Sequence, residues 1–224
     1  MKREIITTAD GSNTIFLPQW QEHYHSRHGA IQEARHVFLE KGILDYQVAH
    51  RTEKLDILEM GLGTGLNAFL TNYQAAALKL PIHYTSIEAY PIEQKEWERL
   101  NYAAAVEDVN SEIIFSKIHR CDWEEEIQIS PFFWLRKERK LFIEVKPPET
   151  FDLVFFDAFA PRVQPDLWNE EIFSNMFGAL RTSGSLVTYC AKGSVRRSLQ
   201  HVGFEVERLP GPPGKREMLR ATKP

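Results

Sequence analysis

At 224 residues, with 43% hydrophobic and 26% charged side chains, the sequence can bury a substantial core without disulfide staples. A net charge of −4 argues against a protein that binds nucleic acid over its whole surface. The longest apolar runs fall far short of the roughly 20 residues that a membrane span needs, and residues 1–5 do not resemble a signal peptide, so we expect a cytoplasmic protein with no membrane partner.

Residues 1–54 are expected to form an N-terminal extension, with Phe38 and Leu39 in a helix, that packs on the rest of the chain. From residue 55 onward short apolar runs alternate with helical periods, which is typical of a parallel α/β sheet. We predict, in chain order, strand 56–60, helix 66–80, strand 83–88, helix 91–105, strand 112–117, strand 151–157, helix 165–180, strand 185–189 and helix 194–202. Pro91 suits a first helical turn, and Gly203 suits a C-terminal cap.

The chain ends differently, with residues 204–209 and 215–221 predicted as two strands around a Pro/Gly loop. A terminal antiparallel hairpin after a doubly wound sheet is a feature of class I methyltransferases. Residues 131–150 interrupt the alternation and predict a surface hairpin inserted before the strand at 151–157. Nothing divides the chain, so we expect one domain over residues 1–224.

The strongest motif lies where the predicted strand 56–60 meets the helix at 66. Gly61, Gly63 and Gly65 alternate with Leu62 and Thr64, in the manner of loops that cradle an adenosyl ligand. The third glycine comes two residues after the second, which departs from the dinucleotide spacing. Glu88 ends the next strand, where an acceptor for ribose hydroxyls belongs. This combination favours S-adenosylmethionine over NAD, although an ordinary strand-to-helix turn is the alternative.

A second motif, Phe155-Phe156-Asp157-Ala158-Phe159-Ala160-Pro161, delivers an acid at the carboxyl end of a strand, where open α/β sheets bind ligands. Asp157 is therefore a candidate catalytic residue, although it could simply cap the following turn. Asp122 follows another predicted strand, at a place where related folds contact the adenine amine. An equal alternative makes Asp122 a helix N-cap.

Charge is unevenly distributed along the chain. Residues 181–224 contain nine Lys or Arg against three Glu, a net of +6, which leaves −10 for residues 1–180. Such asymmetry is expected when one face meets a polyanion, although solvated surface cations would look the same. His23, His25 and His28 cluster without a second ligand group, and Cys121 and Cys190 lack metal-ligand spacing. We therefore expect no metal and reduced thiols.

Several strings, in this order, resemble the MnmC-type tRNA methyltransferases, either the methyltransferase half of the bifunctional enzyme or its standalone form, MnmD. The resemblance covers nearly the whole chain from Tyr24 onward. It rests on residues 23–26 (HYHS), 33–39 (EARHVFL), 59–67 (EMGLGTGLN), 157–161 (DAFAP), 164–168 (QPDLW), 193–197 (GSVRR) and 215–218 (KREM). Two departures stand out: Leu62 replaces the usual phenylalanine, and Gly211-Pro212-Pro213-Gly214 replaces a Gly-Phe-Gly-Arg loop.

The resemblance implies a class I Rossmann-like fold, with a mostly parallel sheet and a C-terminal antiparallel hairpin. It implies methyl transfer from S-adenosylmethionine to the amine of 5-aminomethyl(-2-thio)uridine at the wobble position, in the anticodon stem-loop of tRNA. Without a flavin-binding oxidase domain in this sequence, a separate oxidase would supply the aminomethyl group.

The implied roles fall on thirteen positions. Asp157 would orient the amine and accept its proton, and Tyr24 would line the mouth of the site, unless it merely packs. The expected cofactor-binding residues are Glu59, Gly61, Gly63, Gly65, Asn67, Glu88, Asp122 and Asp157. The expected RNA-binding residues are Arg196, Arg197, Lys215 and Arg216, with the reservation that Glu217 could pair with one of the last two.

Three rival functions stay open on the sequence alone. The same cofactor site could serve a small-molecule or protein amine, with an incidental basic tail. The chain could be a non-catalytic RNA-binding relative, although Asp157 and the intact glycine loop speak against that. A nucleotide-dependent oxidoreductase is disfavoured by the glycine spacing and the terminal hairpin.

Overall fold

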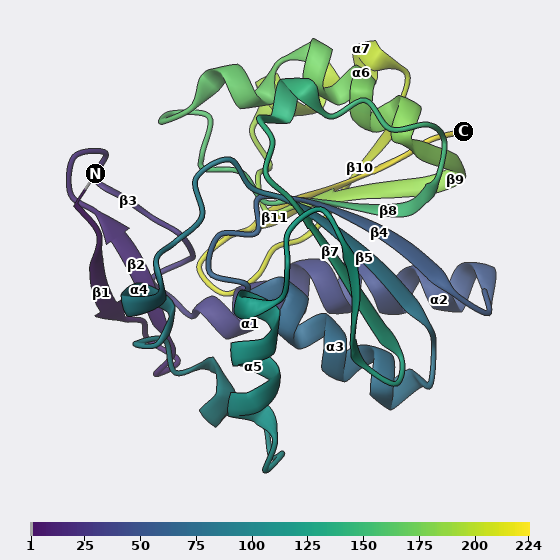
Figure 1. Ribbon diagram of the computed structural model, residues 1–224. Helices are drawn as coiled ribbons and strands as arrows, with labels where there is room; N and C mark the ends of the chain where they lie inside the picture. The colour runs from purple at the N-terminus through teal and green to yellow at the C-terminus, as the bar shows by residue number, and fades with distance from the viewer. Residues whose placement is uncertain (1) are drawn as a thin grey trace.

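The computed structural model describes residues 2–224 and places an eight-stranded sheet at its centre (Figure 1). The strands run in the order β10-β11-β9-β8-β4-β5-β7-β6. Their bounds are β4 Leu55–Met60, β5 Ile82–Ile87, β6 Glu126–Ser130, β7 Phe133–Glu138, β8 Phe151–Phe156, β9 Leu180–Thr188, β10 Glu205–Pro210 and β11 Glu217–Thr222.

The five inner strands β9, β8, β4, β5 and β7 pair in parallel, whereas β11 joins β9 antiparallel and β6 joins β7 antiparallel. The β10–β11 hairpin lies where the sequence predicts it. The class I Rossmann-like fold with a terminal antiparallel hairpin is thereby confirmed.

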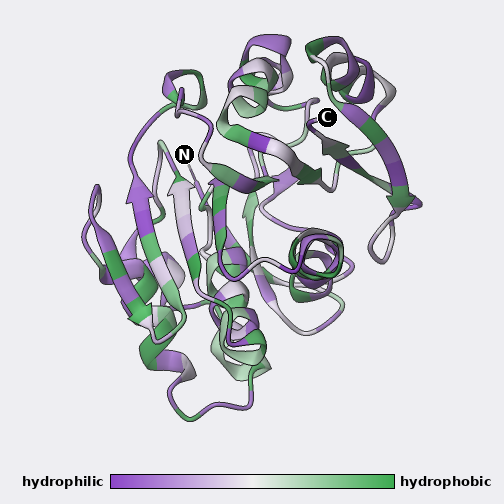
Figure 2. Ribbon diagram, turned by 90° about the vertical axis from the view of Figure 1, so that its right-hand side faces the viewer, coloured by the Kyte–Doolittle hydropathy of each residue, from purple (hydrophilic) through white to green (hydrophobic). Residues whose placement is uncertain are grey.

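Helices cover both faces of this sheet (Figure 1). One layer holds α1 Ala30–Ala34, the π-helical segment η1 Arg35–Leu44, α2 Asp45–His50, α3 Leu66–Leu78 and α5 Ser111–Arg120. The other layer holds α6 Glu170–Ala179 and α7 Gly193–Val202. In Figure 2 hydrophilic and hydrophobic residues alternate along these helices, as expected for helices with one face on a core.

Strand β8 shows how the core forms. All six of its residues are buried, as is usual for a parallel strand covered on both faces. Leu153 and Phe155 pack toward η1 and α3, whereas Val154 and Phe156 pack toward α6 and α7. This alternation follows from the period of two along a strand.

The N-terminal extension is more than a helix. Strands β1 Glu4–Thr7, β2 Asn13–Leu17 and β3 Glu22–His23 form a separate three-stranded sheet beside the short helix α4 Gln94–Trp97 (Figure 1). Phe38 and Leu39 are helical, as predicted, within η1. No helix within residues 2–224 is both long and apolar enough to cross a membrane.

The predicted strand at 112–117 is wrong, because these residues lie in α5. The run Ile113-Ile114-Phe115 looks like a buried strand, yet Ile113 is 64% exposed. The buried positions are Ser111, Phe115 and Ile118, whose spacing of three to four residues is that of a helix.

The strand beside β5 is instead β7, and it corrects a second prediction. Residues 131–150 do not form an inserted surface hairpin: the hairpin is β6–β7, at 126–138, and β7 belongs to the main sheet. Residues 142–144 form only a turn of 3₁₀ helix. The charged stretch after Phe133 alternates in burial, as expected for a strand with one face more exposed than the other.

Two predicted helices are shorter than expected. The span 91–105 contains only α4 and a 3₁₀ turn, Tyr102–Ala105, and Pro91 precedes α4. Between them Asn101 accepts a hydrogen bond from the backbone of Asn13, which ties this turn to the N-terminal sheet. The span 165–180 divides into a 3₁₀ turn, Pro165–Trp168, and α6, because Asn169 caps α6. Gly203 caps α7 with φ +117°, as predicted.

Candidate active site

The glycine loop between β4 and α3 lies at the carboxyl end of the sheet. Gly61, Gly63 and Gly65 all have positive φ, at +104°, +52° and +74°. A Cβ on Gly61 would lie 2.7 Å from the carbonyl oxygen of Asp157. The motif therefore needs glycine both for its backbone conformation and for its close approach to the loop after β8.

Glu88 follows β5 and holds this loop in place. Its Oε2 accepts a hydrogen bond from the backbone of Gly63 at 3.0 Å, and its Oε1 accepts one from the backbone of Tyr90 at 2.8 Å. The side chain also lines a cavity above the loop. The carboxylate thus stands beside the glycine loop, as the sequence predicts for an acceptor of ribose hydroxyls.

The cavity above the glycine loop has a volume of about 810 Å³. It lies at the end of β4, which has β8 on one side and β5 on the other. This is the topological switch point, at which open α/β sheets bind ligands. Its floor includes Gly61, Gly63 and Asn67, and the N-terminal sheet supplies part of the wall above them. A cavity of this size is ample for a nucleoside-sized cofactor with room for an acceptor group.

Asp157 stands on the wall of this cavity with its side chain half-buried. The Nδ2 of Asn67, in the first turn of α3, donates a hydrogen bond to Oδ2 of Asp157 at 2.8 Å. Burial raises the pKa of Asp157 to about 7, and the negative charge of Glu33 acts in the same direction. A carboxyl group that titrates near neutral pH suits general-base chemistry.

Aromatic side chains line the cavity next to the glycine loop, where a Cβ on Gly63 would lie 3.2 Å from the ring of Tyr24. The ring of Tyr24 meets that of Phe159 edge-on at 4.9 Å, and Trp20 meets Phe159 at 5.7 Å. All three line the cavity. Burial raises the pKa of Tyr24 to about 12, so its hydroxyl stays protonated at neutral pH and can donate a hydrogen bond but not accept a proton.

Glu59 and Gly65 do not line the cavity. Glu59 is fully buried, accepts a hydrogen bond from Ser86 at 2.5 Å, and has its pKa raised by burial to about 8. Its carboxyl group therefore supports the site from within the sheet. Gly65 forms the N-cap of α3 and lies against the ring of His119.

Asp122 is exposed and lies away from the cavity wall. The predicted contact with adenine required a strand before Asp122, but α5 precedes it. The predicted N-cap required a helix after Asp122, but β6 follows it. The acid at the end of the strand beside β5 is Glu138, and the backbone of Glu88 donates to its carbonyl oxygen at 3.0 Å. The carboxylate of Glu138 pairs with Arg136 and Lys140 and does not line the cavity.

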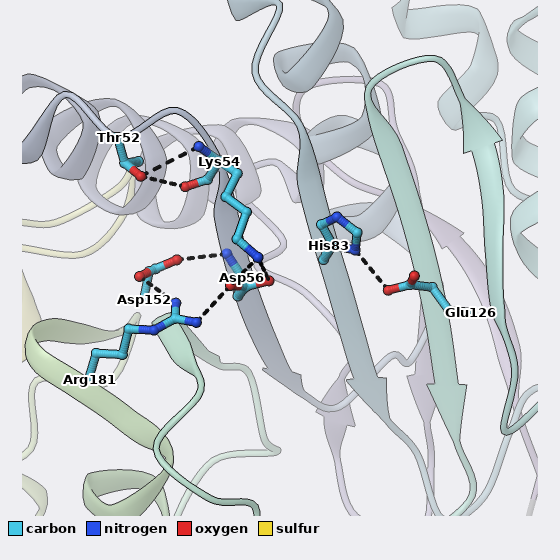
Figure 3. Close-up of polar contacts among 7 residues, drawn as sticks. All are labelled: Thr52, Lys54, Asp56, His83, Glu126, Asp152 and Arg181. Carbon is cyan, nitrogen blue, oxygen red and sulfur yellow. Dashed lines mark hydrogen bonds and ion pairs between the residues drawn. The ribbon is translucent and has the colours of Figure 1, made fainter.

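Several cations of the basic C-terminal segment form ion pairs, most of them with carboxylates of residues 1–180. Arg181 bridges Asp56 and Asp152 at 2.9 and 2.8 Å, at the amino ends of β4 and β8 (Figure 3). None of these three residues lines the cavity. Three more of these cations pair across the fold: Arg220 with Asp45 and Glu207, Lys223 with Glu149, and Lys215 with Glu33. The charge count alone therefore overstates the basic surface.

The four predicted RNA-binding residues differ in their surroundings. Lys215 is turned inward onto Glu33, a partner that sequence reasoning misses. Glu217 pairs with Arg216 at 4.0 Å, one of the two pairings that the sequence allows. Arg216 is 90% exposed. Arg197 is exposed and Arg196 is half-buried, and neither forms an ion pair within residues 2–224.

The histidine cluster does not form a metal site. His25 is half-buried between the hydroxyls of Thr14 and Thr64, and desolvation lowers its pKa to about 4. Across residues 2–224 no three His, Cys, Asp or Glu side chains are grouped to hold a metal ion. Cys121 and Cys190 are free thiols.

Comparison with known proteins agrees with this geometry. A family model described as S-adenosyl-L-methionine-dependent methyltransferase matches residues 87–224. The bifunctional protein MnmC of tRNA 5-methylaminomethyl-2-thiouridine biosynthesis from Cupriavidus metallidurans is 31% identical over 231 residues, covering 97% of this chain and 33% of the relative. The protein of the same name from Marinomonas sp. is 29% identical, covering 89% and 31%. The chain thus spans about a third of the length of these relatives.

Solved structures of similar fold include a known methyltransferase. MnmC2 from Aquifex aeolicus superposes with a TM-score of 0.77 at 27% identity, over 100% of this chain and 71% of that one. CalS10, an amino pentose methyltransferase from Micromonospora echinaspora bound to S-adenosylmethionine, gives 0.52 at 11% identity over 88% and 93%, a likeness of fold alone. With its glycine loop, Glu88 and Asp157 around one cavity, the chain belongs to the S-adenosyl-L-methionine-dependent methyltransferases, of the MnmC type.

Proposed function

We propose that this methyltransferase transfers a methyl group to the amine of 5-aminomethyl(-2-thio)uridine at the wobble position of tRNA, giving the 5-methylaminomethyl product. The relatives named for 5-methylaminomethyl-2-thiouridine biosynthesis support this substrate. The observation that carries the chemistry is Asp157, a carboxyl group with a pKa raised to about 7 on the wall of the cofactor-sized cavity.

The residues present fit S-adenosylmethionine. A Cβ on Gly61 would lie 2.7 Å from the carbonyl oxygen of Asp157 and one on Gly63 would lie 3.2 Å from the ring of Tyr24, so only glycine lets the loop pack this closely. The cavity of about 810 Å³ that these four residues line has room for the cofactor. Gly61, Gly63 and Asn67 would hold the methionine end, and Glu88 would accept hydrogen bonds from the ribose hydroxyls. When bound, the cofactor supplies an electrophilic methyl group on a sulfonium.

The chain's own part in the reaction is alignment and proton transfer. The amine must present a lone pair in line with the methyl–sulfur bond. Asp157 would accept the proton that the amine nitrogen sheds when it takes up the methyl group of the cofactor. Asn67 fixes the orientation of that carboxylate through the 2.8 Å hydrogen bond.

Cofactor binding should raise the thermal midpoint, because a ligand that binds only the folded state stabilises it. We expect S-adenosylmethionine and S-adenosylhomocysteine to raise the midpoint and NAD to leave it unchanged. Glu88→Ala should shrink the shift, because it removes both the ribose acceptor and the anchor of Gly63. Glu53→Ala, at an exposed loop carboxylate, is the control and should keep the full shift. A response to NAD but not to S-adenosylmethionine would contradict the assignment.

Arg197 and Arg216 are the best candidates for phosphate contacts, because both are exposed. Each phosphate contact contributes roughly 0.7–0.9 to the slope of log affinity against log salt. Arg197→Gln with Arg216→Gln should therefore weaken tRNA binding and lower the slope by about 1–2 units. S-adenosylmethionine affinity should not change.

The matched control is Arg51→Gln with Lys79→Gln, which removes two exposed cations beside the amino ends of β4 and β5. That pair should leave the slope unchanged. Equal slopes for both double variants and the wild type would place the RNA contact on another surface.

The substrate itself is tested by mass spectrometry of wobble nucleosides. tRNA carrying the unmodified aminomethyl group is incubated with the protein and S-adenosylmethionine. The expected result is a gain of one methyl group on the wobble nucleoside. Cofactor binding without any methylated nucleoside would reject tRNA as the substrate and direct the search to other amines.

A further inference from the structure

Lys215 occupies an unusual position for a residue of a basic hairpin. Its Nζ forms an ion pair with Glu33, 182 positions earlier in the chain, and lies 3.9 Å from the centroid of the Tyr189 ring. Its side chain is 31% exposed and that of Glu33 only 9%. Lys215 therefore links the terminal hairpin to the start of α1, at a site that is largely closed to solvent.

The loop before Lys215 is shaped for this contact. Gly214 has φ +83°, and a Cβ there would lie 2.1 Å from the ring of His28, so only glycine lets the loop pack so closely. The backbone of Lys215 donates to the carbonyl of Pro212 at 2.9 Å. The Gly-Pro-Pro-Gly loop thus presses the hairpin onto the segment that leads into α1 and carries Lys215 inward.

Glu33 is a buried carboxylate that needs a counter-charge. Apart from Lys215, its hydrogen-bond partner within residues 2–224 is the backbone of Ser26, at 2.9 Å from Oε1. A buried charge without a partner has a high desolvation free energy. Its electrostatic effect on neighbouring charges is also stronger, because little water screens it.

Tyr189 connects this pair to the reacting centre. It lines the same cavity as Asp157, and its hydroxyl donates a hydrogen bond to the carbonyl of Ala158 at 2.8 Å. Ala158 directly follows Asp157, so the ring that Lys215 covers also holds the loop that carries Asp157. Lys215 is therefore connected to the cavity wall through the Tyr189 ring and its hydrogen bond to Ala158.

We propose that Lys215 is a positioning residue, which neutralises Glu33 and braces Tyr189 so that Asp157 is ionised at the pH at which the enzyme works. The proposal rests on the proposed function, in which Asp157 is the proton acceptor. It gives Lys215 a role toward the reacting centre in place of direct contact with RNA.

Groups on several elements around Asp157 bear on this role. Asn67 of α3 and Lys215 favour its ionised form, whereas Glu33 of α1 disfavours it. Glu59 of β4, Tyr84 of β5 and Tyr189, which follows β9, also lie close enough to interact with its charge. Removing Lys215 alone would expose Asp157 to an uncompensated Glu33 and raise the pKa of Asp157 further. Removing both charges would cancel most of that effect.

The test is the pH profile of single-turnover methyl transfer. Lys215→Met should move the acidic limb of the profile up by about one pH unit, and so slow the reaction about tenfold below the limb. Lys215→Arg should keep the wild-type limb. Glu33→Gln combined with Lys215→Met should move the limb back toward wild type. Arg208→Met, which removes an exposed cation paired with Glu217, should leave the profile unchanged.

A second measurement does not depend on the substrate. In protein labelled with ¹³C at aspartate carboxyl carbons, the Asp157 resonance is assigned by its loss in Asp157→Asn and titrated with pH. Lys215→Met should raise its midpoint and the double variant should restore it. Equal slowing at every pH, or a double variant no closer to wild type than Lys215→Met, would overturn the proposal. Absence of methylated tRNA with an intact titration shift would instead count against the proposed function.

Discussion

Replacing Asp157 with asparagine should lower the rate of methyl transfer by about 10²-fold or more, the usual scale for a lost general base. Asparagine keeps the size of the side chain and can still meet Asn67, but its amide does not accept the proton that the amine sheds. The measurement is single-turnover transfer at saturating tRNA and S-adenosylmethionine, with cofactor affinity followed separately.

Asp166→Asn provides the matched control, because Asp166 is an exposed carboxylate in the 3₁₀ turn shortly after the same loop. It should retain wild-type turnover. Near wild-type turnover in Asp157→Asn would make Asp157 structural. Because the hydroxyl of Tyr24 has a pKa raised by burial to about 12, solvent would then be the more reasonable proton acceptor.

The pH dependence of the wild type follows from the same residue. Because burial raises the pKa of Asp157 to about 7, the base form accumulates as the pH rises through that value. Turnover should therefore rise with pH, with an acidic limb near neutrality. A bound sulfonium would favour the carboxylate and move this limb to lower pH. A profile that is flat from pH 5 to pH 8, by contrast, would show that no group of this kind limits the reaction.

Gly61→Ala should combine a loss of stability with a loss of activity. The residue has φ +104°, and the new Cβ would meet the carbonyl oxygen of Asp157 at 2.7 Å. Backbone strain and the forced displacement should cost about 1–3 kcal/mol, or a drop of about 2–12 °C in thermal midpoint for a chain of this size. Moving the Asp157 loop should slow methyl transfer by about 10²-fold, since misalignment near 1 Å has that effect.

Gly178→Ala is the control for this variant. Gly178 lies in α6, and a Cβ added there would have no neighbouring atom within 4 Å, so alanine should leave the midpoint equal or higher, because it favours helix. Both variants are compared by thermal unfolding with and without S-adenosylhomocysteine. If Gly61→Ala kept both its midpoint and its ligand-induced shift, the close approach of the glycine loop to Asp157 would not matter for binding.

The sequence by itself determined the features that rest on local pattern. The glycine loop, Glu88 and Asp157 each follow a short buried strand, and the strands at 55–60, 82–87 and 151–156 were predictable within a residue. Parallel strands bring their carboxyl ends to one edge of a sheet, so these three elements necessarily meet at one site. The terminal hairpin was equally predictable, because a Pro/Gly loop between two strand-like segments is typical of a hairpin.

Only the tertiary structure decided which elements neighbour one another at the edges of the fold. Residues 111–120 are apolar enough for a strand, and packing of one face alone makes them α5. Strand β7 carries charged residues, so its pattern is weak, and its misplacement directed attention to Asp122, which lies away from the cavity. From the sequence alone Lys215 resembles any other surface cation, and only the fold places it beside Glu33, 182 positions away. Periodicity reports which side of an element is buried, whereas the partner of a charge depends on contacts that no local pattern encodes.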